Sequence, residues 1–284
     1  MSFTTNFGIM QGRLLPKFQN RYQAHPIGYW KEEFIIAKEI GLSYIEFILD
    51  QNDCHKNPLL SDLGIVEIEK IIQKTGVGVR SVCADIFMEA PLHSENNFIA
   101  NTSKQILVKL IENSAKIGVT DIVIPCVDQS TLKGEDDQRR LIENLSEPIN
   151  LASKKIINLA LETDLAPIPF LNLLNKLDSD VVKVNYDIGN SASLGYDIFE
   201  EFKLYGNRIS DIHIKDRELG GGSVVLGTGN ANFKSFFEVF SNLDFKGPIV
   251  MQVYRDDEGV EIFKKQFDWF KLKIKNEYDC NYTS

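Results

Sequence analysis

The chain has 284 residues, a length that suits one large α/β barrel of about 250 residues or two small domains. Hydrophobic residues make up 43% of it and charged residues 25%, as in an ordinary soluble globular protein. Its formal net charge is −9 and it has no basic stripe, which argues against nucleic acid or an anionic membrane as its partner. The sequence has no signal-peptide pattern and no apolar run of about 18 residues, so we expect a cytoplasmic protein.

Four cysteines are scattered along the chain without a C-x-x-C spacing: Cys54, Cys83, Cys126 and Cys280. This spacing favours reduced thiols over a disulfide framework or a zinc knot. Buried cysteine behaves as a small hydrophobic residue, and that is the favoured interpretation here. The alternative is a nucleophilic Cys126 at the end of a strand.

Short β-branched runs alternate eight times with longer segments of helical period. The predicted strands are Phe7–Met10, Tyr44–Phe47, Gly78–Ala84, Asp121–Cys126, Ile157–Glu162, Val181–Asp187, Ile209–Lys215 and Ile249–Val253. The helical patterns lie near residues 29–41, 61–75, 98–117, 136–155, 167–177, 197–205, 231–242 and 258–275. Several of the strands are apolar at consecutive positions, which indicates strands covered on both faces.

The alternation of strands and helices predicts a parallel sheet. Gly41, Gly76 and Gly118 each follow a predicted helix, where glycine adopts a left-handed cap at little cost. Eight units favour a closed barrel over an open sheet, and no G-x-G-x-x-G follows the first strand. We therefore predict a single (β/α)8 TIM-barrel domain over residues 1–284.

In such a barrel, polar residues at the carboxyl ends of the strands face the active site. The first four predicted strands end near Gln11 and Arg13, Glu46, Asp85, and Cys126 with Asp128. The last four end near Glu162, Asp187, His213 with Lys215 and Arg217, and Gln252 with Arg255. Strands five to eight therefore deliver carboxylate, imidazole and amide groups, a mixed set that suits Mn²⁺, Mg²⁺, Co²⁺ or Zn²⁺.

Among the four histidines, only His213 lies inside a predicted strand. His25, His55 and His93 fall in predicted loops, where we expect them to be solvated. Since neighbouring strands are about 4.8 Å apart, side chains from strands five to eight can converge on one ion with His213.

The order Glu162, Asp187, His213 and a polar residue on strand eight resembles the sugar isomerase/epimerase group of xylose isomerase-like barrels. The resemblance covers nearly the whole chain and includes GIMQGR, YDIGNSASLGYD, HIKDR, LGTGN and VMQVYR. It implies that Glu162, Asp187, His213 and Gln252 ligate a divalent metal ion. Many members have glutamate in place of Gln252 and histidine in place of Asn190. An amide cannot accept a proton at neutral pH, so a mechanism with one base on each face of the carbon is not expected.

The chemistry that suits such a site is proton abstraction next to a carbonyl through an enediolate. Glu162 is the candidate base, with Glu46 or Asp85 in reserve, and Lys215 is a candidate proton donor. Glu46 is also a candidate contact of the substrate. Arg13, Arg217 and Arg255 are candidates to bind an anionic sugar or sugar phosphate, because guanidinium groups bind phosphate and carboxylate in a bidentate manner.

The glycines at 220–222, together with LGTGN at 226–230, predict a mobile loop over the mouth of the barrel. The leading functional hypothesis is a metal-dependent isomerase or epimerase of a small sugar or sugar phosphate. One alternative is a metal-dependent dehydratase (a lyase) of a cyclic polyol or keto sugar. Another is a non-catalytic sugar-binding barrel. A homo-oligomer is possible, and the sequence leaves the substrate and the metal open.

Overall fold

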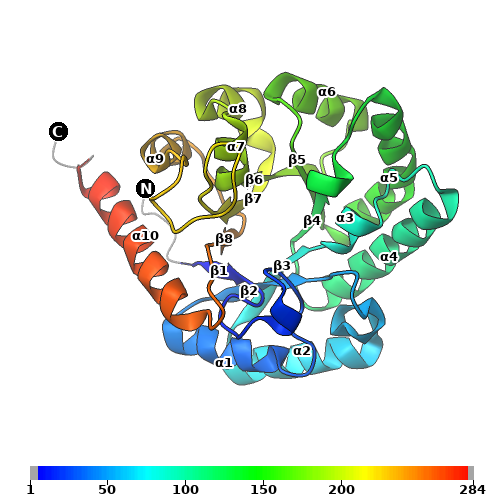
Figure 1. Cartoon of the computed structure of the whole chain (residues 1–284). Helices are drawn as coiled ribbons and strands as arrows, with labels where there is room; N and C mark the ends of the chain where they lie inside the picture. Colours follow the sequence, from blue (N-terminus) through cyan, green and yellow to red (C-terminus); the bar gives the residue numbers. More distant parts are fainter. Residues whose placement is uncertain (1–5, 281–284) are drawn as a thin grey trace.

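The computed structural model describes residues 6–280, with side chains described through residue 276. Eight parallel strands form a closed barrel in which each strand pairs with the next and β8 pairs with β1 (Figure 1). The strands are β1 Gly8–Met10, β2 Tyr44–Ile48, β3 Gly78–Cys83, β4 Asp121–Cys126, β5 Asn158–Thr163, β6 Val182–Asp187, β7 Ile209–Ile214 and β8 Ile249–Met251. The predicted (β/α)8 TIM barrel is confirmed.

Helices surround the barrel and cover its outer face (Figure 1). The eight predicted helices correspond to α1 Trp30–Ile40, α2 Asp62–Thr75, α4 Asn97–Lys116, α5 Glu135–Lys155, α6 Pro167–Leu177, α8 Ile198–Tyr205, α9 Phe233–Ser241 and α10 Val260–Cys280. Two short helices were not predicted, α3 Ile86–Glu89 and α7 Ile188–Leu194. Short 3-10 turns are η1 Phe18–Asn20, η2 Cys54–Lys56, η3 Pro58–Leu60, η4 Asp128–Ser130 and η5 Gly206–Arg208.

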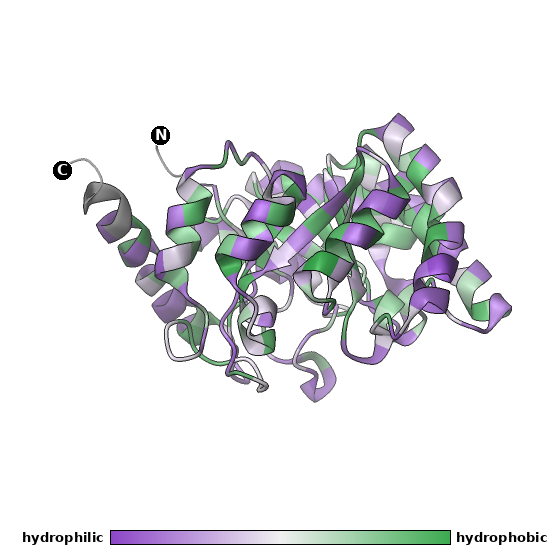
Figure 2. Cartoon of the chain, turned by 90° about the horizontal axis from the view of Figure 1, so that it is seen from above, coloured by the Kyte–Doolittle hydropathy of each residue, from purple (hydrophilic) through white to green (hydrophobic). Residues whose placement is uncertain are grey.

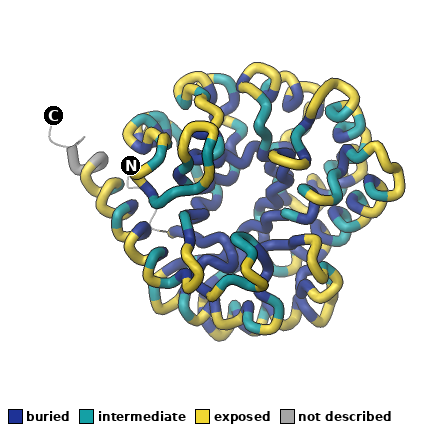
Figure 3. Tube along the Cα trace, in the orientation of Figure 1, coloured by how far each residue is buried: buried dark blue, intermediate teal, exposed yellow. Residues whose placement is uncertain are grey.

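The apolar core lies in two places. The larger cluster lies between the strands and the helices, and the helices seen in Figure 2 carry both hydrophobic and hydrophilic residues. A smaller cluster fills the barrel interior with side chains such as Met10, Tyr44, Ile48 and Val250. The strands are buried while the outer sides of the helices are exposed (Figure 3). Polar groups that face the interior are thus held in a closely packed setting.

Closure of the barrel depends on one tyrosine. β1 and β8 pair over only two residues of each strand. The Tyr44 hydroxyl donates to the Ile249 carbonyl at 3.0 Å and accepts the Ile249 N–H at 2.6 Å. The tyrosine ring lies so close to Gly8 that a Cβ added there would be 2.0 Å from it. Glycine at position 8 therefore leaves the space that Tyr44 needs to bind β8.

Helix ends follow the predicted glycine pattern. Gly41 ends α1 at φ 87° and Gly76 ends α2 at φ 77°, both in the left-handed region that glycine adopts readily. Within residues 6–280, no helix combines the length and the apolar character needed to cross a membrane.

The cysteines whose side chains are described, Cys54, Cys83 and Cys126, are free thiols; the side chain of Cys280 lies outside the described residues. Burial raises the pKa of the Cys126 thiol to about 12, and the neighbouring Asp164 and Glu162 carboxylates add to the shift. The thiol is therefore protonated at neutral pH, which makes a nucleophilic role unfavourable.

Candidate metal and sugar site

A cavity of about 410 Å³ opens at the carboxyl ends of the strands. Its walls come from loops after β1 to β4 and from the ends of β5, β7 and β8. The lining includes Arg21, Gln23, Asp85, Glu162, Asn190, Lys215, Arg217 and Gln252. The cavity is mostly polar in its side chains and large enough for a small sugar phosphate.

Glu162 lies near the end of β5 and is the buried carboxylate at the base of the cavity. Its Oε2 accepts a hydrogen bond from the Asn185 amide at 2.8 Å, and its Oε1 accepts one from the Asn190 amide. Burial, and then the neighbouring Asp187 carboxylate, raise the pKa of Glu162 to about 7. Two amide donors thus fix the direction in which this carboxylate points.

Asp187 and His213 lie side by side because they are register partners on β6 and β7. The Nδ1 atom of His213 is 3.8 Å from Glu162 Oε2 and 3.9 Å from Asp187 Oδ2. Each of the three residues offers a ligand atom, and these atoms all lie within 4.8 Å of one another. The structure therefore brings three of the four predicted ligands together, in a spacing that one ion can bridge.

Gln252 follows β8 and completes the predicted ligand set at the cavity wall. Its Nε2 donates to Gln23 Oε1 at 3.1 Å. Its Oε1 is buried and has no hydrogen-bond partner among the described residues. An unpaired buried oxygen is costly in a folded protein, and an amide oxygen is a good ligand for a divalent cation. The donor set therefore fits a divalent metal ion.

Asn190 links the acidic and basic groups of the site. Its Nδ2 donates to Glu162, while its Oδ1 accepts from Lys215 Nζ at 3.1 Å and from Arg217 Nη1 at 2.8 Å. Lys215 Nζ also donates to Asp187 Oδ2 at 3.2 Å. The structure thus places Lys215 and Arg217 at the cavity, where the sequence predicts them.

Asp216 holds the glycine-rich loop that follows β7. Its Oδ2 accepts the N–H groups of Gly227 and Gly229 at 2.8 and 2.9 Å, and its Oδ1 accepts that of Ala231 at 2.9 Å. The Arg217 guanidinium donates to the Gly221 carbonyl in the same loop. The loop predicted to be mobile is therefore tied to the end of β7 by several hydrogen bonds.

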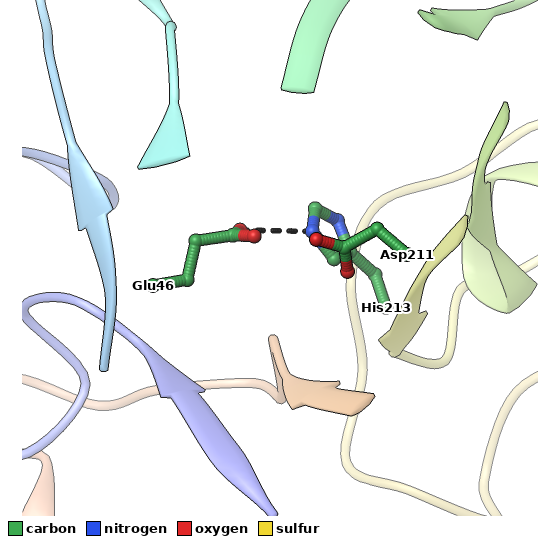
Figure 4. Close-up of side chains that lie close together, drawn as sticks. All are labelled: Glu46, Asp211 and His213. Carbon is green, nitrogen blue, oxygen red and sulfur yellow. Dashed lines mark ion pairs between the residues drawn. The ribbon is translucent and has the colours of Figure 1, made fainter. Parts of the chain in front are cut away.

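Glu46 occupies a different place from the one expected of a substrate contact. It lies in the middle of β2, fully buried in the barrel interior, and it does not line the cavity. Its Oε1 is 2.9 Å from the Nε2 atom of His213 (Figure 4), and its Oε2 accepts from the Ser81 hydroxyl. Of the two reserve bases, Asp85 lines the cavity and Glu46 does not.

His213 therefore has carboxylates on both sides. Burial by itself would lower the pKa of its imidazole, but the carboxylates of Glu46, Glu162 and Asp211 together outweigh burial and raise the pKa above its ordinary value. Asp211 lies on the same side as Glu46 (Figure 4). Burial, and then Glu46, raise the pKa of Asp211 well above its ordinary value.

Arg13 and Arg255 are also buried away from the cavity lining. Arg13 donates to the backbone carbonyls of Val253 and Tyr22, and Arg255 to those of Gly12 and Leu15. Their guanidinium groups thus hold the loops after β1 and β8 together. Their predicted contact with the substrate gains no support from this geometry and stays a prediction.

Sequence reasoning missed Asn185, whose amide nitrogen contacts both Glu162 and His213 Nδ1, the latter at 3.1 Å. The available signal was strand alternation, since Asn185 is two residues before Asp187 and so faces the same side.

The prediction that His25 and His93 are solvated was wrong. Both are buried, and the ring of His25 packs against Phe47 and Trp30. Contact between a loop histidine and an aromatic ring of another element leaves no pattern in the loop sequence. His55 is exposed, as predicted.

The chain belongs to the xylose isomerase-like TIM barrel family, which matches residues 34–273. This assignment confirms the resemblance seen in the sequence motifs. One relative is the L-ribulose-5-phosphate 3-epimerase UlaE of Salmonella heidelberg (strain SL476), 25% identical over 258 residues. The alignment covers 86% of this chain and 90% of that enzyme.

Solved structures share the fold at low sequence identity. An L-ribulose 3-epimerase superposes with a TM-score of 0.76 at 16% identity, covering 98% of this chain and 97% of that one. The IOLI protein, solved with a bound zinc atom, superposes with a TM-score of 0.75 at 15% identity, covering 96% and 99% of the two chains.

Proposed function

We propose that the protein is a metal-dependent isomerase or epimerase of a small sugar or sugar phosphate, which moves a proton at the carbon next to a carbonyl. The observation that carries the proposal is the buried set of Glu162, Asp187 and His213, of which Glu162 lines a polar cavity. The named relatives act on sugars of this type, and the alignment with UlaE spans most of both chains.

Glu162, Asp187, His213 and Gln252 would hold the divalent ion, whose identity among Mn²⁺, Mg²⁺, Co²⁺ and Zn²⁺ stays open. When bound, the ion would polarise the carbonyl and stabilise the charge that develops on its oxygen. Glu162 is the base in this proposal, since it lines the cavity and its carboxylate is oriented by two amides. Lys215 is positioned to donate a proton or to bind an oxyanion.

Gln252 restricts the mechanism. An amide cannot serve as a second base, so a proton returned to the opposite face of the carbon must come from another group. Asp85 is a further carboxylate that lines the cavity, and its Oδ2 accepts from Gln23, the residue that also accepts from Gln252. We assign Asp85 as the candidate for this second role.

A phosphorylated substrate is supported by the name of a relative and by three cations, which share the cavity with the carboxylates of Asp50, Asp85, Glu89, Asp128 and Glu162. Lys215, Arg217 and Arg21 line it, and the relative UlaE is named for a phosphorylated sugar. We therefore expect a sugar phosphate to be preferred over the free sugar. We also propose that the protein works in the cytoplasm, where Cys54, Cys83 and Cys126 stay free thiols.

The direct test is isotope exchange. The purified protein is loaded with Mn²⁺ and incubated in D2O with L-ribulose 5-phosphate, L-ribulose and a panel of related ketoses. Proton NMR should show deuterium entering at the carbon next to the carbonyl and a new epimer or isomer. Chelation should abolish exchange, and Mn²⁺ should restore it.

The matched variants are Glu162→Gln and, as a control, Glu238→Gln on the exposed face of α9. Loss of a general base lowers rates by about 10²- to 10⁴-fold, so exchange should fall in the first variant only. Exchange that survives in Glu162→Gln would move the base to another residue. A product lighter by one water would identify a dehydratase, and sugar binding without exchange would identify a non-catalytic barrel.

A further inference from the structure

His213 belongs to two groups of side chains, each able in composition to hold a cation. The first group, with Glu162 and Asp187, lies on the Nδ1 side of its ring. The second group, with Glu46 and Asp211, includes the 2.9 Å contact of Glu46 with Nε2 (Figure 4). A single neutral imidazole has one nitrogen with a free lone pair, so only one of the groups can use it as a ligand.

Access distinguishes the two groups. In the first group Glu162 lines the cavity at the mouth of the barrel, and Asp187 and His213 lie next to Glu162 without lining the cavity. In the second group neither Glu46 nor Asp211 lines the cavity, and both are fully buried. Glu46 lies between Tyr44 and Ile48 on the inward side of β2, and both of these belong to the packed interior cluster. An ion from solvent therefore has a route to the Nδ1 side, and the Nε2 side is enclosed by packed side chains.

The proton on the ring is placed by its neighbours. The Asn185 Nδ2 atom lies 3.1 Å from Nδ1 and donates to Glu162 Oε2, which identifies it as the amide nitrogen. A ring that binds a metal ion is neutral, and an amide nitrogen is a donor only, so in this form the nitrogen that the amide faces must offer the lone pair. The ring proton then lies on Nε2 and faces the Glu46 carboxylate.

We propose that Glu46 is a positioning residue of the metal site, whose carboxylate, with Oε1 2.9 Å from Nε2 in an ion-pair contact, keeps the ring proton on Nε2 so that Nδ1 is the nitrogen that binds the ion. Ser81 fixes the carboxylate in turn, because its hydroxyl donates to Glu46 Oε2. Metal-binding histidines commonly donate their second ring N–H to a carboxylate, which orients the ring and strengthens the ligand. The inference rests on the metal site of the proposed function and replaces the expected role of Glu46 at the substrate.

The test measures metal affinity rather than turnover. Mn²⁺ is titrated into chelator-treated wild-type protein and into Glu46→Gln, Asp211→Asn and Glu162→Gln, with EPR detection of the free ion. Loss of an orienting carboxylate typically costs about 10- to 100-fold in affinity, which we expect for Glu46→Gln. Glu162→Gln should lose affinity as a ligand variant, and Asp211→Asn should stay within about threefold of wild type.

The inference is overturned if Glu46→Gln binds Mn²⁺ like the wild type, or if the wild type binds no metal. A second pattern also overturns it. If Asp211→Asn loses as much Mn²⁺ affinity as Glu46→Gln and Glu162→Gln loses none, the ion binds in the group of His213 with Glu46 and Asp211, inside the barrel. The deuterium-exchange assay tests the proposed activity, and the Mn²⁺ titration tests the role of Glu46. If exchange fails and the Mn²⁺ affinities follow the expected pattern, the activity is wrong and the role of Glu46 stands.

A second measurement needs no variant at Glu46. In protein labelled with ¹⁵N-histidine, NMR should show a proton coupled to Nε2 of His213, and added Zn²⁺ should shift the Nδ1 signal. The signal is assigned by its absence in His213→Asn. A proton on Nδ1 in the zinc-bound protein, or a zinc shift at Nε2, would contradict the proposal.

Discussion

Asp216 gives the most direct test of how the loop over the barrel mouth is held. The Asp216→Ala change removes the acceptor of three backbone N–H groups, those of Gly227, Gly229 and Ala231. Hydrogen bonds to a charged acceptor contribute about 1.5–3 kcal/mol each. These N–H groups are only partly buried, so water can replace part of what is lost, and we expect a total of about 3 kcal/mol.

The assay is thermal unfolding followed by circular dichroism, together with amide hydrogen exchange. A loss of about 3 kcal/mol corresponds to a melting temperature lower by roughly 5–10 °C for a chain of this size. Asp216→Asn should fall between the wild type and Asp216→Ala, because one amide oxygen can keep the two bonds made by Oδ2. The amides of Gly227, Gly229 and Ala231 should lose protection in both variants.

Two glycines of the same loop provide matched controls. A Cβ at Gly229 would lie 2.3 Å from Asp216 Oδ1, so Gly229→Ala should destabilise the loop much as Asp216→Ala does. A Cβ at Gly222 would meet no atom within 4 Å, so Gly222→Ala should leave the melting temperature unchanged or slightly higher. A melting temperature of Asp216→Ala within 1 °C of wild type, with unchanged protection, would refute the reasoning.

Three further outcomes follow from buried contacts. Burial raises the pKa of Glu33 from 4.5 to about 7, so the folded protein holds this proton more tightly than the unfolded chain. The free energy of unfolding should therefore fall by about 3 kcal/mol as the pH rises from about 4.5 to above 7. Urea unfolding at several pH values should show that fall in the wild type and not in Glu33→Gln; parallel curves would contradict it. Tyr44→Phe leaves the N–H and carbonyl of Ile249 without their partner and should cost about 2 kcal/mol in urea unfolding, whereas a cost below 0.5 kcal/mol would show that β8 does not depend on it. Gly189→Ala puts a Cβ 2.8 Å from Lys215 Cγ and 3.1 Å from the Lys215 backbone carbonyl carbon, so we expect kcat to fall about tenfold and the melting temperature to fall as well; an unchanged kcat would place Lys215 outside the chemistry.

The fold could be predicted because its signals are local. Strands covered on both faces appear as apolar runs, and the longer helices show their apolar stripe. The prediction carried β8 to Val253, whereas the strand ends at Met251, with one further backbone hydrogen bond from the Gln252 N–H to the Ile214 carbonyl of β7. The α7 helix was missed because IGNSASL has no helical pattern; the Asp187 side chain begins it by accepting the Asn190 N–H, and Gly195 ends it.

The site could be predicted only as far as strand alternation reaches. Alternation tells which face of a strand a residue occupies. The position at strand ends, on which the prediction rested, holds for Glu162, Asp187 and His213, which lie together. Height along the barrel axis depends on the stagger between strands, which the pairing register sets. Glu46 pairs with Met10 and Ser81 in the middle of the sheet, and so lies below the mouth.

Arg13 and Arg255 show a second limit. Arginine after a strand suits a phosphate and a backbone carbonyl equally well, because its fork of N–H donors fits both. Only the three-dimensional path of the loops reveals which acceptor lies near an arginine. Here the acceptors are backbone carbonyls of the neighbouring loops, that of Val253 for Arg13 and that of Leu15 for Arg255.

The contact of Glu46 with His213 joins the second strand to the seventh across the barrel. A chain that is still being synthesised can form β5 and β6, and so present Glu162 and Asp187, before His213 exists. Pairs so far apart in sequence form only when most of the chain is in place. The nascent chain would therefore have little affinity for metal until most of the barrel has formed, and binding then also adds to its stability.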